Sequence, residues 1–191
     1  MRKALACRLG GFTLIEILIV IAIVSVLASM VLGGVIASQR KTRQALAETF
    51  IAVWNGEIED YYLDCGEYPA TECPTGENAF PALFEALAGE KPPLGTGGPG
   101  APYVTVKEED VAVADEEPGA YRRATVHEIY DPKVPKYVRD PWGNPYVYRE
   151  NRSRPRTPFM KRPNKTDLYS TGPDGVDQTA QGEEGDDIGN W

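Results

Sequence analysis

The sequence predicts an α+β fold, in which one long N-terminal helix packs on a small antiparallel β-sheet. An apolar run and then an amphipathic helical pattern fill residues 12–64 without a proline. Short segments rich in β-branched and aromatic residues, bounded by turn residues, follow after residue 136. Because helical and strand-forming segments are segregated along the chain, they favour an α+β arrangement.

Residues 12–36 form an apolar run whose only charged side chain is Glu16. Roughly 20 apolar residues, at about 1.5 Å rise each, cross the ~30 Å hydrocarbon core of a bilayer. We therefore predict a transmembrane helix over 12–36, preceded by a basic leader over 1–11. A secretory signal peptide is the alternative, but its apolar region spans only about 7–15 residues and precedes the small residues of the cleavage site. Here Gly10 and Gly11 come before the run, so we expect the span to stay in the mature protein.

Glu16 is an anomaly within this run. A carboxylate in a spanning helix costs about 2.5–3.5 kcal/mol or more and normally has a partner. No Lys or Arg lies one helical turn away. A new amino terminus at Phe12, created by cutting after Gly11, would lie one turn from Glu16 or would come from a neighbouring copy. The alternative is a carboxyl near the helix start that is neutral or reaches the lipid headgroups.

The charge balance and the cysteines limit the classes of function. The formal net charge is −8, and removal of the basic leader would leave 17 cations against 28 anions. A basic face for nucleic acid is therefore not supported. The mature chain would keep Cys65 and Cys73, which we predict to form a disulfide on the exported side of a membrane. Two free thiols are the alternative.

Residues 37–64 have the pattern of an amphipathic helix. Apolar side chains recur there at three- and four-residue spacing, and we expect this helix to continue from the span. Two separate helices, divided near Gly33-Gly34, are the alternative. Gly66 suits the left-handed residue that ends a helix. The predicted apolar stripe consists of Leu46, Phe50, Val53, Trp54, Ile58 and Tyr61.

Residues 65–136 are expected to be a loop region with an insertion. A short helix is predicted over 78–87, and a Gly- and Pro-rich surface loop over 89–102. Residues 103–106 and 111–114 are predicted to be two strands joined by an acidic turn. His127 is the only histidine and is expected at the surface. Because no catalytic motif or phosphate-binding loop is present, the sequence predicts no enzyme.

Residues 137–191 are expected to form the β-sheet. Turn residues fill 139–145, and a strand over 146–148 is predicted to pair antiparallel with 167–170. A basic, proline-bearing loop lies between the two strands.

The segment from residue 166 to 191 has seven carboxylates and no Lys, Arg or His. A disordered, solvated tail is one interpretation. The apolar residues Ile188 and Trp191 favour the other, in which the end docks on the domain. Docking would crowd carboxylates with no internal cation to offset them, and a bound Ca²⁺ would solve this with about 6–8 oxygen ligands. Zinc is disfavoured because no Cys or His is near.

The string Gly11-Phe12-Thr13-Leu14-Ile15-Glu16 before the apolar run resembles the processing motif of the type IV pilin and pseudopilin family. The resemblance implies a pilin-like fold. It also implies that a prepilin peptidase cuts between Gly11 and Phe12 and methylates the Phe12 amine. Glu16 would then neutralise that amine on a neighbouring subunit during filament assembly.

Three C-terminal strings, over 140–146, 169–175 and 187–191, are similar to the major pseudopilins of type II secretion systems. That resemblance implies a calcium site with Asp174, Asp186 and Asp187 as side-chain ligands and the carbonyls of Thr171 and Val176 completing much of the shell. The middle of this chain is longer than is usual in the family. The span between residues 174 and 186 is also lengthened, so that Glu183 or Glu184 is a candidate to replace one ligand.

The implied function is that of a structural subunit of a pseudopilus, the helical filament that drives protein export. The expected partners are other copies of the chain, minor pseudopilins, an inner-membrane assembly platform and the prepilin peptidase. The expected location is the bacterial inner membrane, with a single pass and the C-terminal domain in the periplasm. A type IV pilus pilin is the first alternative, although its usual C-terminal disulfide is excluded here because no cysteine follows Cys73. A membrane-anchored, calcium-dependent binding module is the second.

Overall fold

The computed structural model describes residues 12–69, 78–88, 102–117, 119–151, 160–182 and 185–191, with the side chains of residues 30–36 excepted. The chain divides into two compact units, Met1–Thr42 and Arg43–Trp191. Because residues 1–11 lie outside the described residues, the predicted leader is not tested by the structure.

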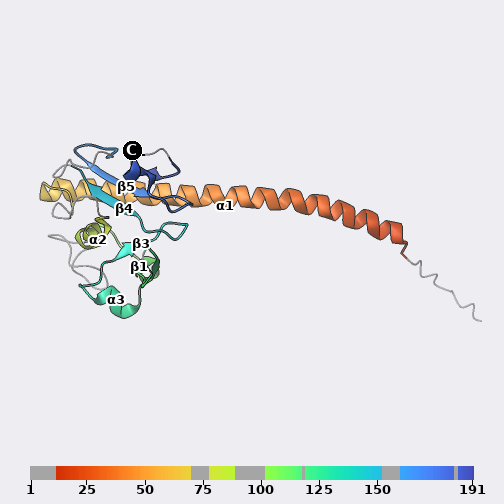
Figure 1. The fold of residues 1–191 in the computed structure, drawn as a ribbon, viewed down its shortest axis with the longest axis horizontal. Coiled ribbons are helices and arrows are strands. Elements are labelled where there is room, and N and C mark those ends of the chain that lie inside the picture. The colour runs from red at the N-terminus through yellow and green to blue at the C-terminus, as the bar shows by residue number, and fades with distance from the viewer. Residues whose placement is uncertain (1–11, 70–77, 89–101, 118, 152–159, 183–184) are drawn as a thin grey trace, which may run out of the picture. The chain divides into compact units, whose positions relative to one another are not determined.

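Helix α1, Leu14–Cys65, is one continuous helix that includes both the predicted apolar span and the predicted amphipathic helix after it (Figure 1). The prediction of continuity is confirmed, and the alternative of two separate helices is wrong. Gly66 follows with φ of 81° and its N–H donates to the Tyr62 carbonyl, as expected for the residue that ends a helix. Within the described residues, no helix has an apolar stretch long enough to cross a membrane. The predicted span includes residues 30–36, whose side chains are outside the description, and it stays a prediction.

In the second unit, α1 buries a narrower face than the sequence pattern suggested. The fully or nearly fully buried residues are Ala47, Ile51, Trp54 and Ile58. Leu46 and Val53, which were predicted in the apolar stripe, are 57% and 54% exposed, so that part of the prediction is wrong. The physical reason is that spacings of three and four fit two adjacent stripes, and the small Ala47 lets the core approach on one of them.

Helix α2, Phe80–Ala88, confirms the helix predicted over 78–87. Its apolar side chains Phe80, Leu83, Phe84 and Leu87 are fully buried, as the helical spacing predicts. Asn78 fixes its start: the Asn78 Oδ1 accepts from the Phe80 N–H at 3.0 Å and from the Tyr148 N–H at 3.0 Å. One side chain thereby caps the helix and covers the edge of a strand.

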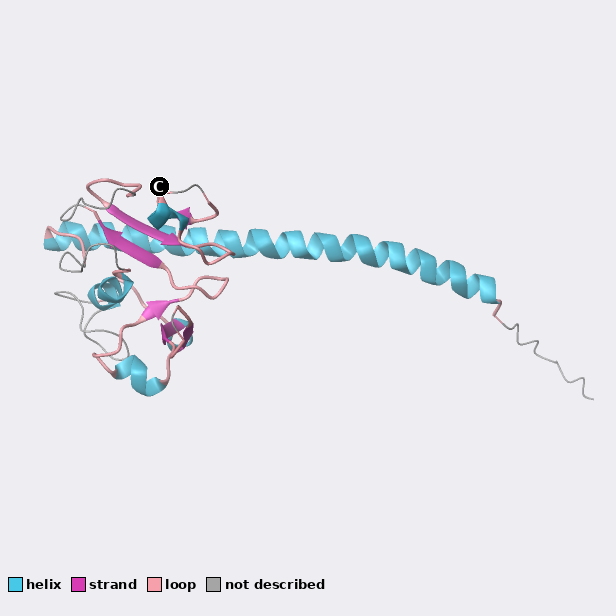
Figure 2. Cartoon of the chain, viewed as in Figure 1, coloured by secondary structure: helices cyan, strands magenta, loops and turns pink. Residues whose placement is uncertain are grey.

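The C-terminal sheet has the strand order β4-β5-β6, and β4 and β5 are the two long magenta arrows that lie side by side in Figure 2. Its strands are β4 Val147–Glu150, β5 Thr166–Ser170 and β6 Ile188–Gly189, all antiparallel. Tyr148 pairs with Leu168 and Ser170 pairs with Ile188. The predicted hairpin over 146–170 is confirmed, and the last residues add a third strand that the sequence did not predict.

A second three-stranded sheet, in the order β2-β1-β3, is formed by two strands of the insertion and by β3, which follows it. It consists of β1 Val111–Ala114, β2 Tyr121–Arg123 and β3 Tyr137–Val138. The predicted strand over 103–106 is wrong, because the N–H groups of Tyr103 and Val104 donate to the Leu87 carbonyl instead. The intervening acidic residues form a short 3₁₀ turn, η1 Glu108–Asp110, rather than a hairpin turn.

Helix α3, Val126–Tyr130, follows β2 and is held by a capping box between Thr125 and Glu128. His127 is exposed, as predicted. The core of the second unit gathers the buried face of α1, α2 and the inner faces of both sheets, with Tyr146, Tyr148 and Leu168 at most 1% exposed. The predicted α+β class is confirmed, with two small sheets in place of one.

Candidate functional site

Thr13 and Glu16 form a reciprocal capping box at the start of α1. The Glu16 Oε2 accepts hydrogen bonds from the Thr13 N–H at 2.8 Å and the Thr13 hydroxyl at 2.7 Å, and the Glu16 N–H donates to Thr13 Oγ1 at 3.3 Å. These bonds satisfy N–H groups that a helix start leaves unpaired. The pairing was missed from the sequence, although Thr-x-x-Glu before an apolar run is its signature.

The processing site lies partly outside the described residues, because Gly11 precedes them. Phe12 is 78% exposed and comes directly before the capping box. Cys65, at the end of α1, is half-buried and forms no disulfide with another described residue. Cys73 lies outside the described residues, so the predicted disulfide stays a prediction.

The turn around Asp140 is hydrogen-bonded to the start of the C-terminal loop. The Asp140 Oδ1 accepts from the N–H groups of Trp142 at 3.0 Å and Asn144 at 2.9 Å, and its Oδ2 accepts from the Ser170 hydroxyl at 2.6 Å. Asn144 Nδ2 donates to the Gly172 carbonyl at 3.0 Å. Burial raises the pKa of Asp140, and these hydrogen bonds to its oxygens oppose the rise. The turn thus sets the position of the loop that begins at residue 171.

The end of the chain is ordered against this sheet, which confirms docking over the disordered alternative. The Asn190 N–H donates to the Leu168 carbonyl at 3.1 Å, and the Leu168 N–H donates back to Asn190 Oδ1 at 3.2 Å. Asn190 Nδ2 donates to the Thr166 carbonyl at 3.1 Å and to Asn55 Oδ1 at 2.7 Å. A Cβ at Gly189 would meet the Trp191 ring at 2.4 Å, so that glycine makes room for the ring.

One carboxylate of the tail is offset by a cation that lies outside residues 166–191. Arg149 on β4 donates to Asp177 Oδ2 at 2.9 Å, and the Tyr169 hydroxyl donates to Asp177 Oδ1 at 2.9 Å. Asp177 also accepts from the Ala180 N–H and caps helix α4, Gln178–Gln181. The charge of Asp177 is therefore neutralised by Arg149, and a further cation would be needed only for the remaining carboxylates of the tail.

The predicted ligands Asp174 and Asp186 have different contacts. Asp174 is exposed, and its two oxygens accept from the Val176 N–H at 2.8 Å and from Gln178 Nε2 at 2.6 Å. Asp186 lies over Gly172: a Cβ added there would come within 2.7 Å of the Asp186 carbonyl oxygen. Gly172 has φ of 68° and permits this approach.

Asp187 is the predicted ligand that has one carboxylate oxygen without a hydrogen-bond partner among the described residues. Its Oδ2 accepts from the Thr179 N–H at 2.7 Å, whereas its Oδ1 is buried without a partner among the described residues. Burial raises the pKa of Asp187, and the charges of Asp177 and Asp186 raise it further. Thr171 Oγ1 and Gln178 Oε1 are likewise buried and have no partner in the described part of the chain.

The donor atoms of this loop suit a hard cation. Three buried oxygens, from the Thr171 hydroxyl, the Gln178 amide and the Asp187 carboxylate, lack partners among the described residues, and such atoms normally bind a partner or water. Ca²⁺ prefers oxygen ligands of these kinds. Among the described residues, however, no three His, Cys, Asp or Glu side chains gather into a group able to hold a metal. Gln178 is a candidate ligand that the sequence did not single out. Glu183 and Glu184 lie outside the described residues.

Known proteins are similar to this chain in its N-terminal segment and along nearly its whole length. The family described as "Prokaryotic N-terminal methylation motif" matches residues 8–32. The chain is similar to the "Type II secretion system core protein G" of Klebsiella pneumoniae, with 30% identity covering 96% of this chain and 95% of the relative. The protein of the same name from Pseudomonas aeruginosa is 31% identical, covering 95% and 94%.

A solved structure, the major pseudopilin from the type 2 secretion system of enterohaemorrhagic Escherichia coli, is similar at 24% identity with a TM-score of 0.39, covering 82% of this chain and 92% of that one. The matches to the relatives from Klebsiella pneumoniae and Pseudomonas aeruginosa extend across nearly the whole chain. The chain belongs to the family of type II secretion system core protein G.

Proposed function

We propose that this chain, a structural subunit of a type II secretion pseudopilus, is cut after Gly11, methylated on Phe12 and polymerised through Glu16. The methylation motif matched over residues 8–32 and the relatives' shared name support this function. The observation that carries it is the position of Glu16 at the exposed first turn of α1, close to residue 12.

The capping box leaves Glu16 able to take a second partner. Both hydrogen bonds to its carboxylate go to Oε2, so Oε1 has no partner among the described residues. A Phe12 amine from a neighbouring copy would donate to this oxygen, and pairing the two charges would offset the cost of burying either alone. A head-to-tail contact of this kind does not close, so it builds an open helix rather than a ring.

Processing is tested by mass spectrometry of the mature chain isolated from its own membranes. We expect an N-terminal peptide that begins at methylated Phe12. A mature chain that still carries the leader, or begins after residue 36, would contradict the proposed function.

Ca²⁺ is proposed as the cation of the C-terminal loop. The unpartnered oxygens of Thr171, Gln178 and Asp187 support it, together with the carbonyl of Asp186 beside Gly172. Asp174, Asp186 and the carbonyls of Thr171 and Val176 remain in the proposed ligand set. A bound cation would remove the repulsion between neighbouring carboxylates and hold β6 on the sheet. The subunit would then be rigid enough to assemble.

The cellular setting follows from the same proposal. A prepilin peptidase and an inner-membrane platform would act on the N-terminal segment, and minor pseudopilins would share the filament. Residues 12–36 would anchor the precursor in the inner membrane, with the unit from Arg43 onward in the periplasm. Fractionation of inner and outer membranes, with protease access from the periplasmic side, tests this placement.

A further inference from the structure

The side-chain amide of Gln178, on α4, has different surroundings at its two ends. Its Nε2 donates to Asp174 Oδ2 at 2.6 Å, whereas its Oε1 is buried and has no hydrogen-bond partner among the described residues. An ionised carboxylate only accepts hydrogen bonds, so Asp174 determines which end of the amide faces it. The amide oxygen is therefore turned away from Asp174 and toward the protein interior.

Asp174 is itself held in place by the turn that it begins. Its Oδ1 accepts from the Val176 N–H at 2.8 Å, and the Gln178 N–H donates to the Val176 carbonyl at 3.0 Å. Both the backbone and the side chain of Gln178 are thus joined to residues 174–176. Because these contacts fix the amide before anything binds, a ligand of its oxygen would pay little ordering entropy.

Gly185 provides the space that the amide fills. A Cβ at this position would lie 2.5 Å from Gln178 Cδ and 2.8 Å from its Oε1. The φ angle of Gly185 lies outside the left-handed region, so the backbone alone would admit other residues and the nearby amide is what excludes them. Since Gly185 directly precedes Asp186 and Asp187, the amide oxygen lies beside the backbone that carries two of the predicted ligands.

The two other buried oxygens without a partner in the described part of the chain lie along the same segment. Asp187 Oδ2 accepts from the N–H of Thr179 on α4 at 2.7 Å, which leaves its Oδ1 as the unpartnered atom. Thr171 is 6% exposed with an unpartnered Oγ1, and it precedes Gly172, over which the Asp186 carbonyl lies. A hydroxyl, an amide and a carboxylate oxygen therefore flank residues 185–187.

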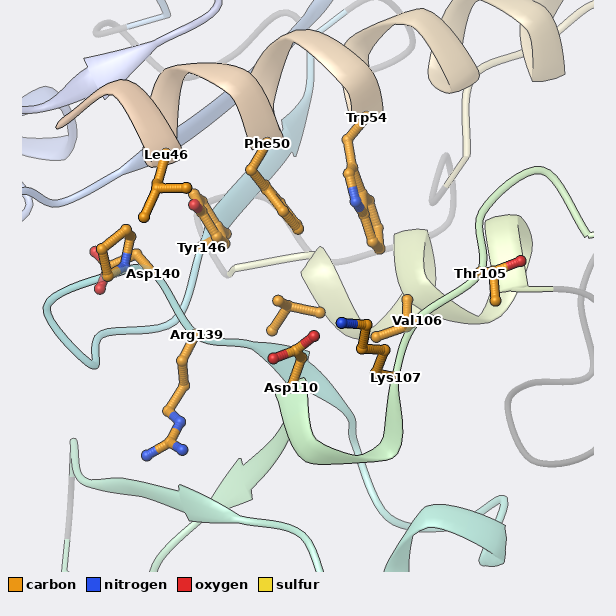
Figure 3. A pocket seen from close by; sticks show the side chains of 12 residues that line it. Leu46, Phe50, Trp54, Thr105, Val106, Lys107, Asp110, Arg139, Asp140 and Tyr146 are labelled. Atoms are coloured by element: carbon orange, nitrogen blue, oxygen red, sulfur yellow. The ribbon is translucent and has the colours of Figure 1, made fainter. Parts of the chain in front are cut away.

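The start of the loop is fixed by the turn that lines the groove beside α1. This groove encloses about 460 Å³, and Asp140 is one of its lining residues (Figure 3). Asp140 Oδ2 accepts from the Ser170 hydroxyl at 2.6 Å, and Ser170 Oγ accepts from the Gly172 N–H at 3.1 Å. The Gly172 carbonyl accepts from Asn144 Nδ2 at 3.0 Å. Because the N–H and the carbonyl of residue 172 are both bonded, the neighbouring Thr171 is positioned without a cation.

We infer that the amide oxygen of Gln178 is a ligand of the cation proposed for the C-terminal loop, and that Asp174 and Gly185 hold this amide in place. Side-chain amide oxygens are among the ligands that Ca²⁺ prefers. Because the amide is neutral, it adds an oxygen without adding to the repulsion among the carboxylates of the loop. This inference rests on the proposed function, and it departs from the ligand set implied by the family resemblance, which contains no glutamine.

Calorimetric titration of Ca²⁺ into the chelator-treated full chain in detergent tests the ligand. Gln178→Leu should raise the Kd for Ca²⁺ by about tenfold, the effect of losing one contact between an oxygen and a charged group. Gly185→Ala should weaken binding similarly, because its Cβ would displace the amide. Gln181→Leu, at an exposed position on the same helix, is the matched control and should keep the wild-type Kd.

The outcomes separate this inference from the proposed cation itself. A wild-type Kd for Gln178→Leu would overturn the role of the amide and leave Ca²⁺ binding standing. A wild-type chain that binds no Ca²⁺ would overturn both, whereas the processing of Phe12 tests the filament subunit independently.

Thermal unfolding distinguishes a ligand from a side chain that only supports the fold. In chelator, Gln178→Leu should not melt below wild type, because the oxygen it removes has no partner there among the described residues. With Ca²⁺ it should melt below wild type. A loss of equal size in both buffers would mean that the amide stabilises the fold rather than the bound cation, and would overturn the inference.

A double-mutant cycle tests the positioning role of Asp174. In an Asp174→Ala background the amide has lost the carboxylate that orients it, so Gln178→Leu should change the Kd for Ca²⁺ by a smaller factor than it does in wild type. The same factor in both backgrounds would show that Asp174 does not act through Gln178.

Discussion

Asn190 Nδ2 lies 2.7 Å from Asn55 Oδ1, and this hydrogen bond joins the end of the chain to the helix that forms the base of the second unit. The same amide also bonds to the backbone of β5, at the Thr166 carbonyl and the Leu168 N–H. One side chain therefore holds the tail, the sheet and the helix together. Any cation bound in the loop before residue 190 would act on a tail that this contact already positions.

Asn190→Ala should release the tail and lower the free energy of unfolding by about 1–3 kcal/mol, because it leaves buried partners unsatisfied. Urea unfolding of the full chain in detergent, followed by tryptophan fluorescence, measures the effect. Asp60→Ala, an exposed position on the same helix, is the control and should stay within about 0.5 kcal/mol of wild type. Equal free energies of unfolding for the two variants would show that the hydrogen bonds of Asn190 do not stabilise the fold.

Calcium should raise the stability of the wild-type chain. A ligand that binds only the folded state adds about 2.7 kcal/mol when its concentration is one hundred times Kd. Asp187→Asn removes a charged oxygen with no partner among the described residues, so the calcium-dependent gain should largely disappear. Thermal unfolding with calcium and with a chelator measures it, and Asp60→Asn serves as the control. A wild-type melting temperature that is the same in both buffers would count against the site.

The pH dependence without calcium should have the opposite sign to that of a salt-bridged carboxylate. Because burial raises the pKa of Asp187, the folded state favours its protonated form. The resulting stability is complete below the unfolded pKa of about 3.9 and is lost as the pH rises through the folded pKa. In chelator, wild type should therefore lose stability relative to Asp187→Asn as the pH rises above about 4. Parallel pH profiles for the two proteins would argue against a raised pKa.

Burial along α1 can be tested by two matched truncations. Ile58→Ala empties a fully buried position and should cost about 2–5 kcal/mol. Leu46→Ala lies on the exposed flank and should change the stability of the isolated subunit by no more than about 0.5 kcal/mol. Urea unfolding of both variants measures the difference, and a large loss at residue 46 would mean that the helix packs on its other stripe.

The sequence predicted best where local rules decide the structure. The helix end at Gly66, the buried face of α2 and the pairing of β4 with β5 follow from residue types and spacing. Leu46 and Val53 were misplaced because two helical faces fit the same spacing, and only tertiary packing chooses between them. Residues 103–106 were wrongly predicted to be a strand, because the N–H groups of Tyr103 and Val104 donate to the Leu87 carbonyl.

The candidate site likewise contains some features that the sequence could predict and others that it could not. The capping box of Thr13 and Glu16 was present in the sequence as Thr-x-x-Glu and could have been predicted. The pairing of Arg149 with Asp177 could not, because it joins residues 28 positions apart across two strands. Gln178 gave no signal at all, since an amide beside a carboxylate is common on any surface.

The direct test of the whole account is Glu16→Gln in the full-length chain. Glutamine also forms a capping box with Thr13, so the start of α1 is kept while the charge is removed. Sedimentation and electron microscopy of assembled filaments should show processed, membrane-inserted subunits that fail to polymerise. Filaments of normal length and yield from this variant would contradict the central claim that a charged Glu16 joins one subunit to the amine of the next.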